Sequence, residues 1–282
     1  MKTGILVASF GTTHLDTLEK TIVAVERDVA AAFPQAVCYR AFTSGMVRRG
    51  LKKKYDIAVD SVEEALERMK TDGVEQGVVL PTLVIPGDEY ERLRANVLRN
   101  AGHMKVAMGL PLLWDDADLE NMVKTLTEAY PTGDDTVLLA MGHGTEHPCG
   151  CLYLRLAQRM QHAGMALCTV EGTPSFEDAI CQLKEQGCRK AHLVPMLLVA
   201  GDHSKNDMVG VEEDSLRSLL ERSGFEVNWT LQGLGEIPAV RERYVMRAKD
   251  AYGCLTKERF PWNIAFRDWC WPEPTVVAAK PR

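Results

Sequence analysis

Three residues of this sequence are of types that bind transition metals. One of them is next to glycine, and the other two are separated from a glycine by a single aspartate. The three are Glu89 in "PGDEY", His143 in "MGHGT" and His203 in "AGDHS". Imidazole and carboxylate ligands together suit Co²⁺, Ni²⁺, Fe²⁺ or Zn²⁺ better than Mg²⁺ or Ca²⁺. The same groups accept protons near neutral pH. We expect them to form a metal site that also accepts protons. The alternative is that each histidine only satisfies local hydrogen bonds.

An internal repeat helps to choose between these interpretations. Residues 61–89 align without a gap with residues 175–203, sharing Ser, Glu, Ala, Lys, Gly, Pro, Leu, Gly and Asp at matching positions. A shorter match sets "SFGTTH" (9–14) beside "GHGTEH" (142–147). The sequence therefore predicts two similar halves.

The halves differ in chemistry at two aligned positions. Phe10 stands opposite His143, and Glu89 stands opposite His203. Similar halves share what the fold requires, so paired replacements of this kind indicate function. All four residues are expected in loops just past the carboxyl ends of strands, where open parallel α/β sheets bind ligands.

The elements that must position these residues follow from hydrophobic periodicity. Short β-branched runs alternate with amphipathic helical patterns such as 13–33, which indicates parallel sheets covered by helices. Ser61 with Glu64 and Ser175 with Asp178 predict capped helix starts, and a glycine follows each helix as a left-handed cap, at 73 and 187. The expected strands are 4–8, 37–42, 77–85, 105–110, 136–141, 167–170, 191–199 and 226–231.

The predicted fold is α/β, with two similar domains, each a parallel four-stranded sheet flanked by helices. Pro and Gly break the pattern near 125–133, so the domains are set at 1–128 and 129–282. Helices over 211–223 and 236–252 are expected to close the second domain. A cleft between the domains would collect Glu89, His143 and His203 from three loops, with Phe10 as an apolar wall.

Composition excludes several classes of protein. A net charge of −6 without a basic stripe argues against nucleic-acid binding. No apolar run is long enough for a membrane span, and no signal peptide opens the sequence, so we expect a cytoplasmic protein. The eight cysteines are expected to be mostly free thiols, with a zinc site at His147, Cys149 and Cys151 as a minor alternative. Dinucleotide, phosphate-loop and serine-hydrolase motifs are missing.

One local basic cluster stands out in "MVRRGLKKKY". Arg48, Arg49 and Lys52 to Lys54 lie within seven positions of an otherwise acidic chain. The cluster is either a solvated helix face or a docking site for a polyanionic ligand.

Taken in order, "SFGTT", "FTSGMVRRGL", "PTLVIPGDEYE", "MGHGTEHP", "TVEGTPS" and "VPMLLVAGDHSKNDM" resemble the anaerobic cobalt chelatases of cobalamin synthesis, which are class II tetrapyrrole chelatases. The resemblance spans residues 3–250. It implies a chelatase-like fold and ATP-independent insertion of Co²⁺ into sirohydrochlorin or precorrin-2, with no cofactor beyond this substrate metal. It also implies metal-binding and catalytic roles for Glu89, His143 and His203, and a further acidic position at Glu171.

Metallation of such a ring must remove two pyrrole N–H protons while the metal exchanges its ligands. We expect His143 and His203 to ligate the metal, one of them to accept a proton, and Glu89 to balance charge and relay protons. The polycarboxylate substrate would be held by the basic cluster and by the first loop. The predicted substrate-binding residues are Ser9, Phe10, Thr12, Thr13, Arg48, Arg49, Glu171 and Lys205.

Several alternatives stay open. Nickel or iron insertion into sirohydrochlorin uses the same ligands, and affinity order alone would favour nickel over cobalt. A non-catalytic tetrapyrrole or metal carrier, or a structural α/β protein with incidental histidines, would also fit the fold. Self-association into a homo-oligomer, the oxidation state of the ring and the role of the tail are also undecided. The tail aromatics are expected to pack on the protein surface or on an oligomer partner; they are Trp262, Phe266, Trp269 and Trp271.

Overall fold

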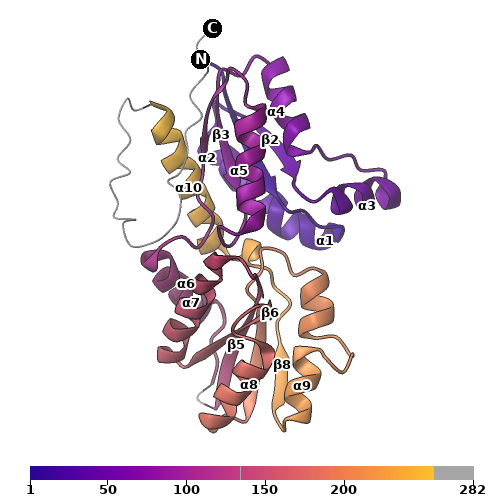
Figure 1. Cartoon of the computed structure of the whole chain (residues 1–282), viewed down its shortest axis with the longest axis vertical. Helices are drawn as coiled ribbons and strands as arrows, with labels where there is room; N and C mark the ends of the chain where they lie inside the picture. The colour runs from indigo at the N-terminus through magenta and orange to yellow at the C-terminus, as the bar shows by residue number, and fades with distance from the viewer. Residues whose placement is uncertain (134, 257–282) are drawn as a thin grey trace. The chain divides into compact units, whose positions relative to one another are not determined.

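The structure is a computed structural model that describes residues 1–133 and 135–256. The chain folds into two compact units (Figure 1). Among the described residues, unit 1 contains 1–13, 22–112 and 241–256, and unit 2 contains 14–21 and 113–240. The tail aromatics named above lie outside the described residues. No helix in the described part of the chain is both long and apolar enough to cross a bilayer.

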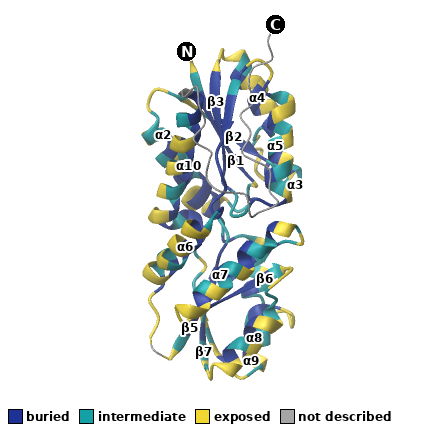
Figure 2. Ribbon diagram, turned by 60° about the vertical axis from the view of Figure 1, so that its left-hand side comes forward, coloured by how far each residue is buried: buried dark blue, intermediate teal, exposed yellow. Residues whose placement is uncertain are grey.

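Unit 1 is built on a parallel sheet with the strand order β2-β1-β3-β4. The central strand β1 places Ile5 opposite Cys38 on one side and Val78 on the other. Helices cover the sheet, and its central strands are buried (Figure 2). Their residues are therefore mostly apolar on both faces. The strands are β1 (Thr3–Ser9), β2 (Val37–Phe42), β3 (Gln76–Pro81) and β4 (Lys105–Met108). The helices are α2 (Ala24–Ala32), α3 (Gly45–Tyr55), α4 (Val62–Thr71), α5 (Asp88–Asn100) and most of α10 (Pro238–Thr256).

Unit 2 repeats this plan with the strand order β6-β5-β7-β8, again all parallel. Its strands are β5 (Thr136–Gly144), β6 (Met165–Glu171), β7 (Lys190–Pro195) and β8 (Glu226–Trp229). Its helices are α1 (Leu15–Leu18), α6 (Asp116–Ala129), α7 (Cys151–His162), α8 (Phe176–Glu185) and α9 (Leu216–Arg222). Shorter helical turns are η2 (Pro148–Gly150), η3 (Ser204–Met208) and η4 (Leu234–Glu236), while η1 (Glu19–Val23) joins α1 to α2. The predicted fold class is therefore confirmed, and a strand lies at each of the eight predicted places. The strands expected over 77–85 and 191–199 end earlier, at Pro81 and Pro195.

The local signals of the repeat are also present in the structure. Both predicted capping boxes form, at Ser61 before α4 and at Ser175 before α8. Gly73 and Gly187 have φ of +74° and +73°, as expected for left-handed residues after a helix. Each half thus uses the same turn chemistry to lead a helix into the third strand of its sheet.

The C-terminal helix departs from the sequence prediction. A helix over 236–252 was expected to close the second domain, but α10 joins unit 1 from Arg241 onward. There Arg241 Nε donates to Asp28 Oδ2 at 2.6 Å, and Tyr244 Oη donates to the Leu83 carbonyl at 3.3 Å. The division into domains 1–128 and 129–282 stays a prediction. It describes the two halves of the sequence repeat, whereas each compact unit is made of several chain segments.

Strand β5 is longer than its sequence pattern indicates. It was expected to end at 141 with His143 in a loop, but the strand continues to Gly144, which pairs with Glu171 of β6. Gly144 has φ of +82°, and a Cβ added there would lie 1.7 Å from the Glu171 carbonyl oxygen. Only glycine allows the two backbones to approach so closely. The matching Gly11 in unit 1 has φ of +97°, but a Cβ added there would meet the ring of Phe42 at 2.5 Å and not a backbone.

We predict that Gly144→Ala destabilises unit 2 far more than a glycine replacement without this contact. Gly164 is the matched control, because its φ is +73° and nothing lies within 4 Å of an added Cβ. Gly164→Ala should lower the free energy of unfolding by roughly 1–2 kcal/mol, the cost of a left-handed alanine. Gly144→Ala should cost about 2 kcal/mol more, because the backbones of β5 and β6 must separate. Urea denaturation followed by circular dichroism measures both values, and equal losses would contradict the prediction.

Candidate metal site

Unit 2 brings two of the predicted metal ligands together. His143 lies in the last residues of β5, and His203 precedes the helical turn η3. Their ring centroids are 4.7 Å apart and their planes are nearly perpendicular, at 87°. A divalent ion bonds an imidazole nitrogen at about 2.0–2.1 Å, so both rings are within reach of one ion.

The hydrogen bonds of the two rings fix which nitrogen is left for a metal. His143 Nδ1 lies 3.1 Å from the Gly144 carbonyl oxygen, and His203 Nδ1 lies 2.8 Å from Asp207 Oδ2. Carbonyl and carboxylate oxygens only accept hydrogen bonds, so Nδ1 must carry the hydrogen in both rings. When the rings are neutral, each therefore presents the lone pair of Nε2. Both side chains are 44% exposed, so an ion can reach them from solvent.

Two carboxylates accompany the histidine pair. Glu171, at the end of β6, places Oε2 3.9 Å from His143 Nδ1. Asp207 bonds His203 directly and was not selected from the sequence, although its spacing of four residues from His203 is the signal for a shared helical face. Carboxylates that bond the second nitrogen of a metal-binding histidine orient the ring and raise its basicity.

Glu89, the third predicted ligand, belongs to unit 1. It lies in the first turn of α5, where Oε1 accepts a hydrogen bond from Arg92 at 3.3 Å. Helical positions replace the loops that were expected for Glu89 and His203, because helical structure begins at the aspartate of each Gly-Asp pair, Asp88 and Asp202. In the described part of the chain, no three His, Cys, Asp or Glu side chains are grouped to hold a metal. The role of Glu89 in metal binding therefore stays a prediction.

The minor zinc alternative is not supported by the local geometry. His147 Nδ1 accepts a hydrogen bond from the Cys149 backbone at 3.3 Å and so caps the turn η2. Cys149 itself is buried, and the cysteines that the structure describes are free thiols. The sequence "HPCGC" thus serves as a turn before α7.

The predicted substrate-binding residues of the first loop differ in their accessibility. Phe10 is 46% exposed, as expected for an apolar wall. Ser9 is fully buried and its hydroxyl accepts a hydrogen bond from Thr82 at 2.7 Å, so this side chain is not accessible to a ligand, contrary to expectation. Thr12 is also buried, and Thr13 is half-buried.

The basic cluster lies on α3, and its members are not equivalent. Arg48 donates to Glu64 at 3.1 Å, and Lys52 pairs with Asp56 at 2.5 Å. Arg49 is exposed, and no residue of the described chain accepts a hydrogen bond from it. Arg49 is therefore the stronger candidate for a carboxylate of a ligand, while Arg48 is already neutralised.

Lys205, the remaining predicted contact, lies in η3 two residues after His203. Its Nζ is 3.1 Å from His14 Nδ1, and His14 was not selected from the sequence.

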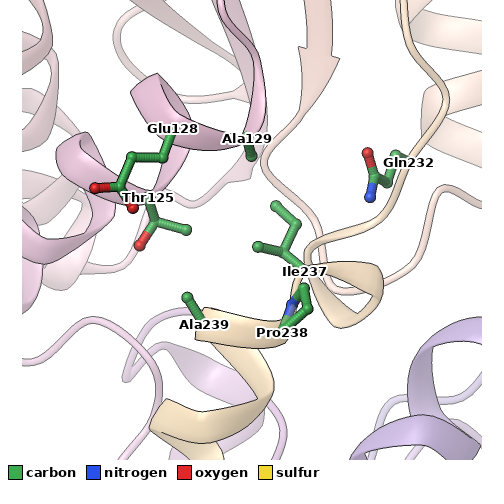
Figure 3. Close-up of a pocket in the computed structure, with 7 residues that line it drawn as sticks. All are labelled: Thr125, Glu128, Ala129, Gln232, Ile237, Pro238 and Ala239. Carbon is green, nitrogen blue, oxygen red and sulfur yellow. The ribbon is translucent and has the colours of Figure 1, made fainter.

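Unit 2 also contains a cavity of about 360 Å³ between α6 and the start of α10 (Figure 3). None of the predicted site residues lines it. Its walls are formed by Thr125, Glu128, Ala129, Gln232, Ile237, Pro238 and Ala239. The chemistry of the histidine pair therefore belongs to a different part of the unit.

Solved structures share the fold at low sequence identity. SirB from Bacillus subtilis with Fe³⁺ matches with a TM-score of 0.62 and 16% identity, covering 89% of this chain and 96% of that one. The sirohydrochlorin chelatase SirB from Bacillus subtilis subspecies spizizenii in complex with cobalt matches with a TM-score of 0.57 and 15% identity, covering 89% and 95%. These likenesses agree with the two parallel sheets described above.

Curated relatives are closer in sequence. The sirohydrochlorin cobaltochelatase of Salmonella typhimurium is 35% identical over 262 residues, covering 92% of this chain and 99% of the relative. The sirohydrochlorin cobaltochelatase CbiKC of Nitratidesulfovibrio vulgaris is 33% identical over 245 residues, covering 83% and 85%. The model of the cobalt chelatase (CbiK) family matches residues 3–253. With this match over nearly all of the described residues, the chain belongs to the cobalt chelatase (CbiK) family.

Proposed function

We propose that this protein inserts Co²⁺ into sirohydrochlorin, the substrate named for its two curated relatives, and that His143 and His203 hold the ion before transfer. The observation that carries the proposal is the histidine pair of unit 2, whose Nδ1 atoms are both engaged and whose Nε2 atoms are both left for a metal. ATP has no part in the reaction, in keeping with the lack of a phosphate-binding loop in the sequence. The sequence predicts that the enzyme acts in the cytoplasm.

A pair of imidazoles suits an ion that must leave again. Two protein ligands leave several coordination positions to water, and these positions are where ring nitrogens can enter. Borderline ions such as Co²⁺ bind imidazole well, whereas Mg²⁺ and Ca²⁺ prefer oxygen ligands. The pair therefore selects the class of metal and keeps the ion exchangeable.

The same two nitrogens account for the protons. The free ring loses two N–H protons when it takes up a divalent ion, and each bond broken between the ion and an Nε2 frees one lone pair. A freed imidazole is a base near neutral pH, so one of the two histidines accepts the first pyrrole proton as the ion departs, and the Nε2 lone pair of the other is left for the second. Glu171 and Asp207 stabilise the imidazolium that results, because their carboxylates lie close to the Nδ1 sides of the two rings.

Unit 1 offers the side chains that suit the substrate ring. Phe10 presents an exposed aromatic ring, and Arg49 presents an exposed guanidinium that can pair with a carboxylate in a bidentate manner. Glu89 keeps the role implied by the family resemblance, and Glu89→Gln tests that role in the assay below.

We predict that the purified protein metallates sirohydrochlorin over multiple turnovers and that His143→Ala loses this activity. The measurement is anaerobic metallation followed by absorbance, with Co²⁺, Ni²⁺ and Fe²⁺ in parallel. The rate should fall by roughly 100-fold or more, because the variant lacks both a metal ligand and a proton acceptor. His162→Ala is the matched control, since His162 is exposed at the end of α7.

The same assay separates the competing functions. A faster rate with Ni²⁺ or Fe²⁺ than with Co²⁺ would reassign the metal. Stoichiometric binding of the ring without a rate above the enzyme-free reaction would contradict the enzyme and leave a carrier.

We further predict that Asp207→Ala weakens Co²⁺ binding by about 10- to 100-fold, the usual effect of removing the carboxylate behind a metal-binding histidine. Asp207→Asn should have a Co²⁺ affinity between those of Asp207→Ala and the wild type, because its amide oxygen still accepts a hydrogen bond from His203 Nδ1–H. The affinity is measured by titrating Co²⁺ and following its visible absorbance. Asp214→Ala is the control, because it removes an exposed carboxylate nearby in the sequence and should leave the Co²⁺ affinity unchanged. An unchanged affinity in Asp207→Ala would exclude this role.

A further inference from the structure

We propose that His14 is a positioning residue, which holds the ammonium group of Lys205 ready for a carboxylate of the substrate. The inference rests on the proposed function, since it concerns how the chelatase binds its ring. His14 carries no role in the sequence prediction and is not one of the metal ligands proposed above.

Both ring nitrogens of His14 are engaged within unit 2. Nε2 lies 2.9 Å from Asp202 Oδ1, and Nδ1 lies 3.1 Å from Lys205 Nζ. A carboxylate only accepts, so Nε2 carries the hydrogen, and Nδ1 therefore offers a lone pair to the ammonium group. Asp202, His14 and Lys205 thus form one chain of hydrogen bonds with a single tautomer of the histidine.

Two members of this chain of hydrogen bonds lie on either side of the proposed metal ligand His203 in the sequence. Asp202 precedes His203 directly, and Lys205 follows it by two residues at the start of η3. His14 approaches them from a distant part of the sequence, in the segment 14–21 that packs with unit 2. The ammonium group of Lys205, two residues after His203, is therefore held by a side chain from a distant part of the sequence.

The repeat shows that this contact is particular to His14. In the alignment of "SFGTTH" with "GHGTEH", His14 stands opposite His147. His147 Nδ1 accepts a hydrogen bond from the backbone of Cys149, two residues further on, and so caps a local turn. The equivalent His14 instead bonds side chains nearly 200 positions away in sequence, as the separations of 188 and 191 residues show.

Fixing Lys205 has a consequence for binding rather than for the chemical step. A free lysine side chain loses much rotamer freedom when its ammonium group is held in one place. His14 holds the Lys205 side chain in one conformation before the substrate binds. Two N–H donors of the ammonium group are then left for a carboxylate. The carboxylate is present in the substrate and in the product alike, so the contact strengthens binding uniformly. Its loss should raise KM and leave kcat unchanged.

The test is a double-mutant cycle on sirohydrochlorin metallation, with His14→Leu, Lys205→Met and the double variant. Each single variant should raise KM for sirohydrochlorin by roughly three- to fivefold at low salt, with kcat unchanged. The double variant should be no worse than Lys205→Met alone, because His14 acts through Lys205. His14→Gln should restore the wild-type KM, since its amide can donate to Asp202 and accept from Lys205.

Controls keep the result specific. His103→Leu removes an exposed histidine from the turn before β4 and should leave KM unchanged. Thermal unfolding of each variant shows whether a change in KM reflects a loss of folded protein. Additive effects in the cycle, a fall in kcat with constant KM, or a wild-type KM in His14→Leu would overturn the inference. A wild-type protein without turnover would instead contradict the proposed function, and these outcomes are therefore distinguishable.

Discussion

The close approach of β5 to the end of β6 is the constraint on which the rest of the site depends. Gly144 makes this approach with a positive φ, and its carbonyl oxygen also accepts the hydrogen bond from His143 Nδ1. One residue therefore extends the strand, fixes the ring of His143 and brings Glu171 beside it. The metal chemistry begins with backbone geometry, because a side chain at position 144 would push apart the two strands that place these groups.

Duplication explains how such a site could arise on a simple scaffold. Both units use the same strand order, the same capping boxes and a glycine of positive φ after or within the first strand. Unit 2 departs from unit 1 by carrying imidazoles at the end of β5 and in the segment after β7, where unit 1 carries Phe10 and Glu89. Neighbouring parallel strands end at the same edge of a sheet, which places the two imidazoles of unit 2 together.

Periodicity and turn chemistry predicted the strands, the parallel sheets, the helix caps and the residues of the histidine pair, because these depend on contacts close in sequence or on the repeat. Other features depend on tertiary contacts that no local pattern encodes. The extension of β5 requires pairing with β6, and the pairing of Arg48 with Glu64 depends on two helices packing together. Burial of the Ser9 hydroxyl and the contact of His14 with Lys205 likewise join distant parts of the chain. Asp207 could have been found from its spacing to His203, since both lie on one helical turn.

The path of the chain through the two units has a consequence for how the protein can be divided. The segment 14–21 belongs to unit 2, although the strands on either side of it belong to unit 1, and the chain returns to unit 1 at Arg241. Cutting the gene at any single point between codons 13 and 241 would therefore separate the first segment of unit 1 from its last one. Neither unit exists as one contiguous fragment, so a ribosome must finish almost the whole polypeptide before unit 1 has all of its parts.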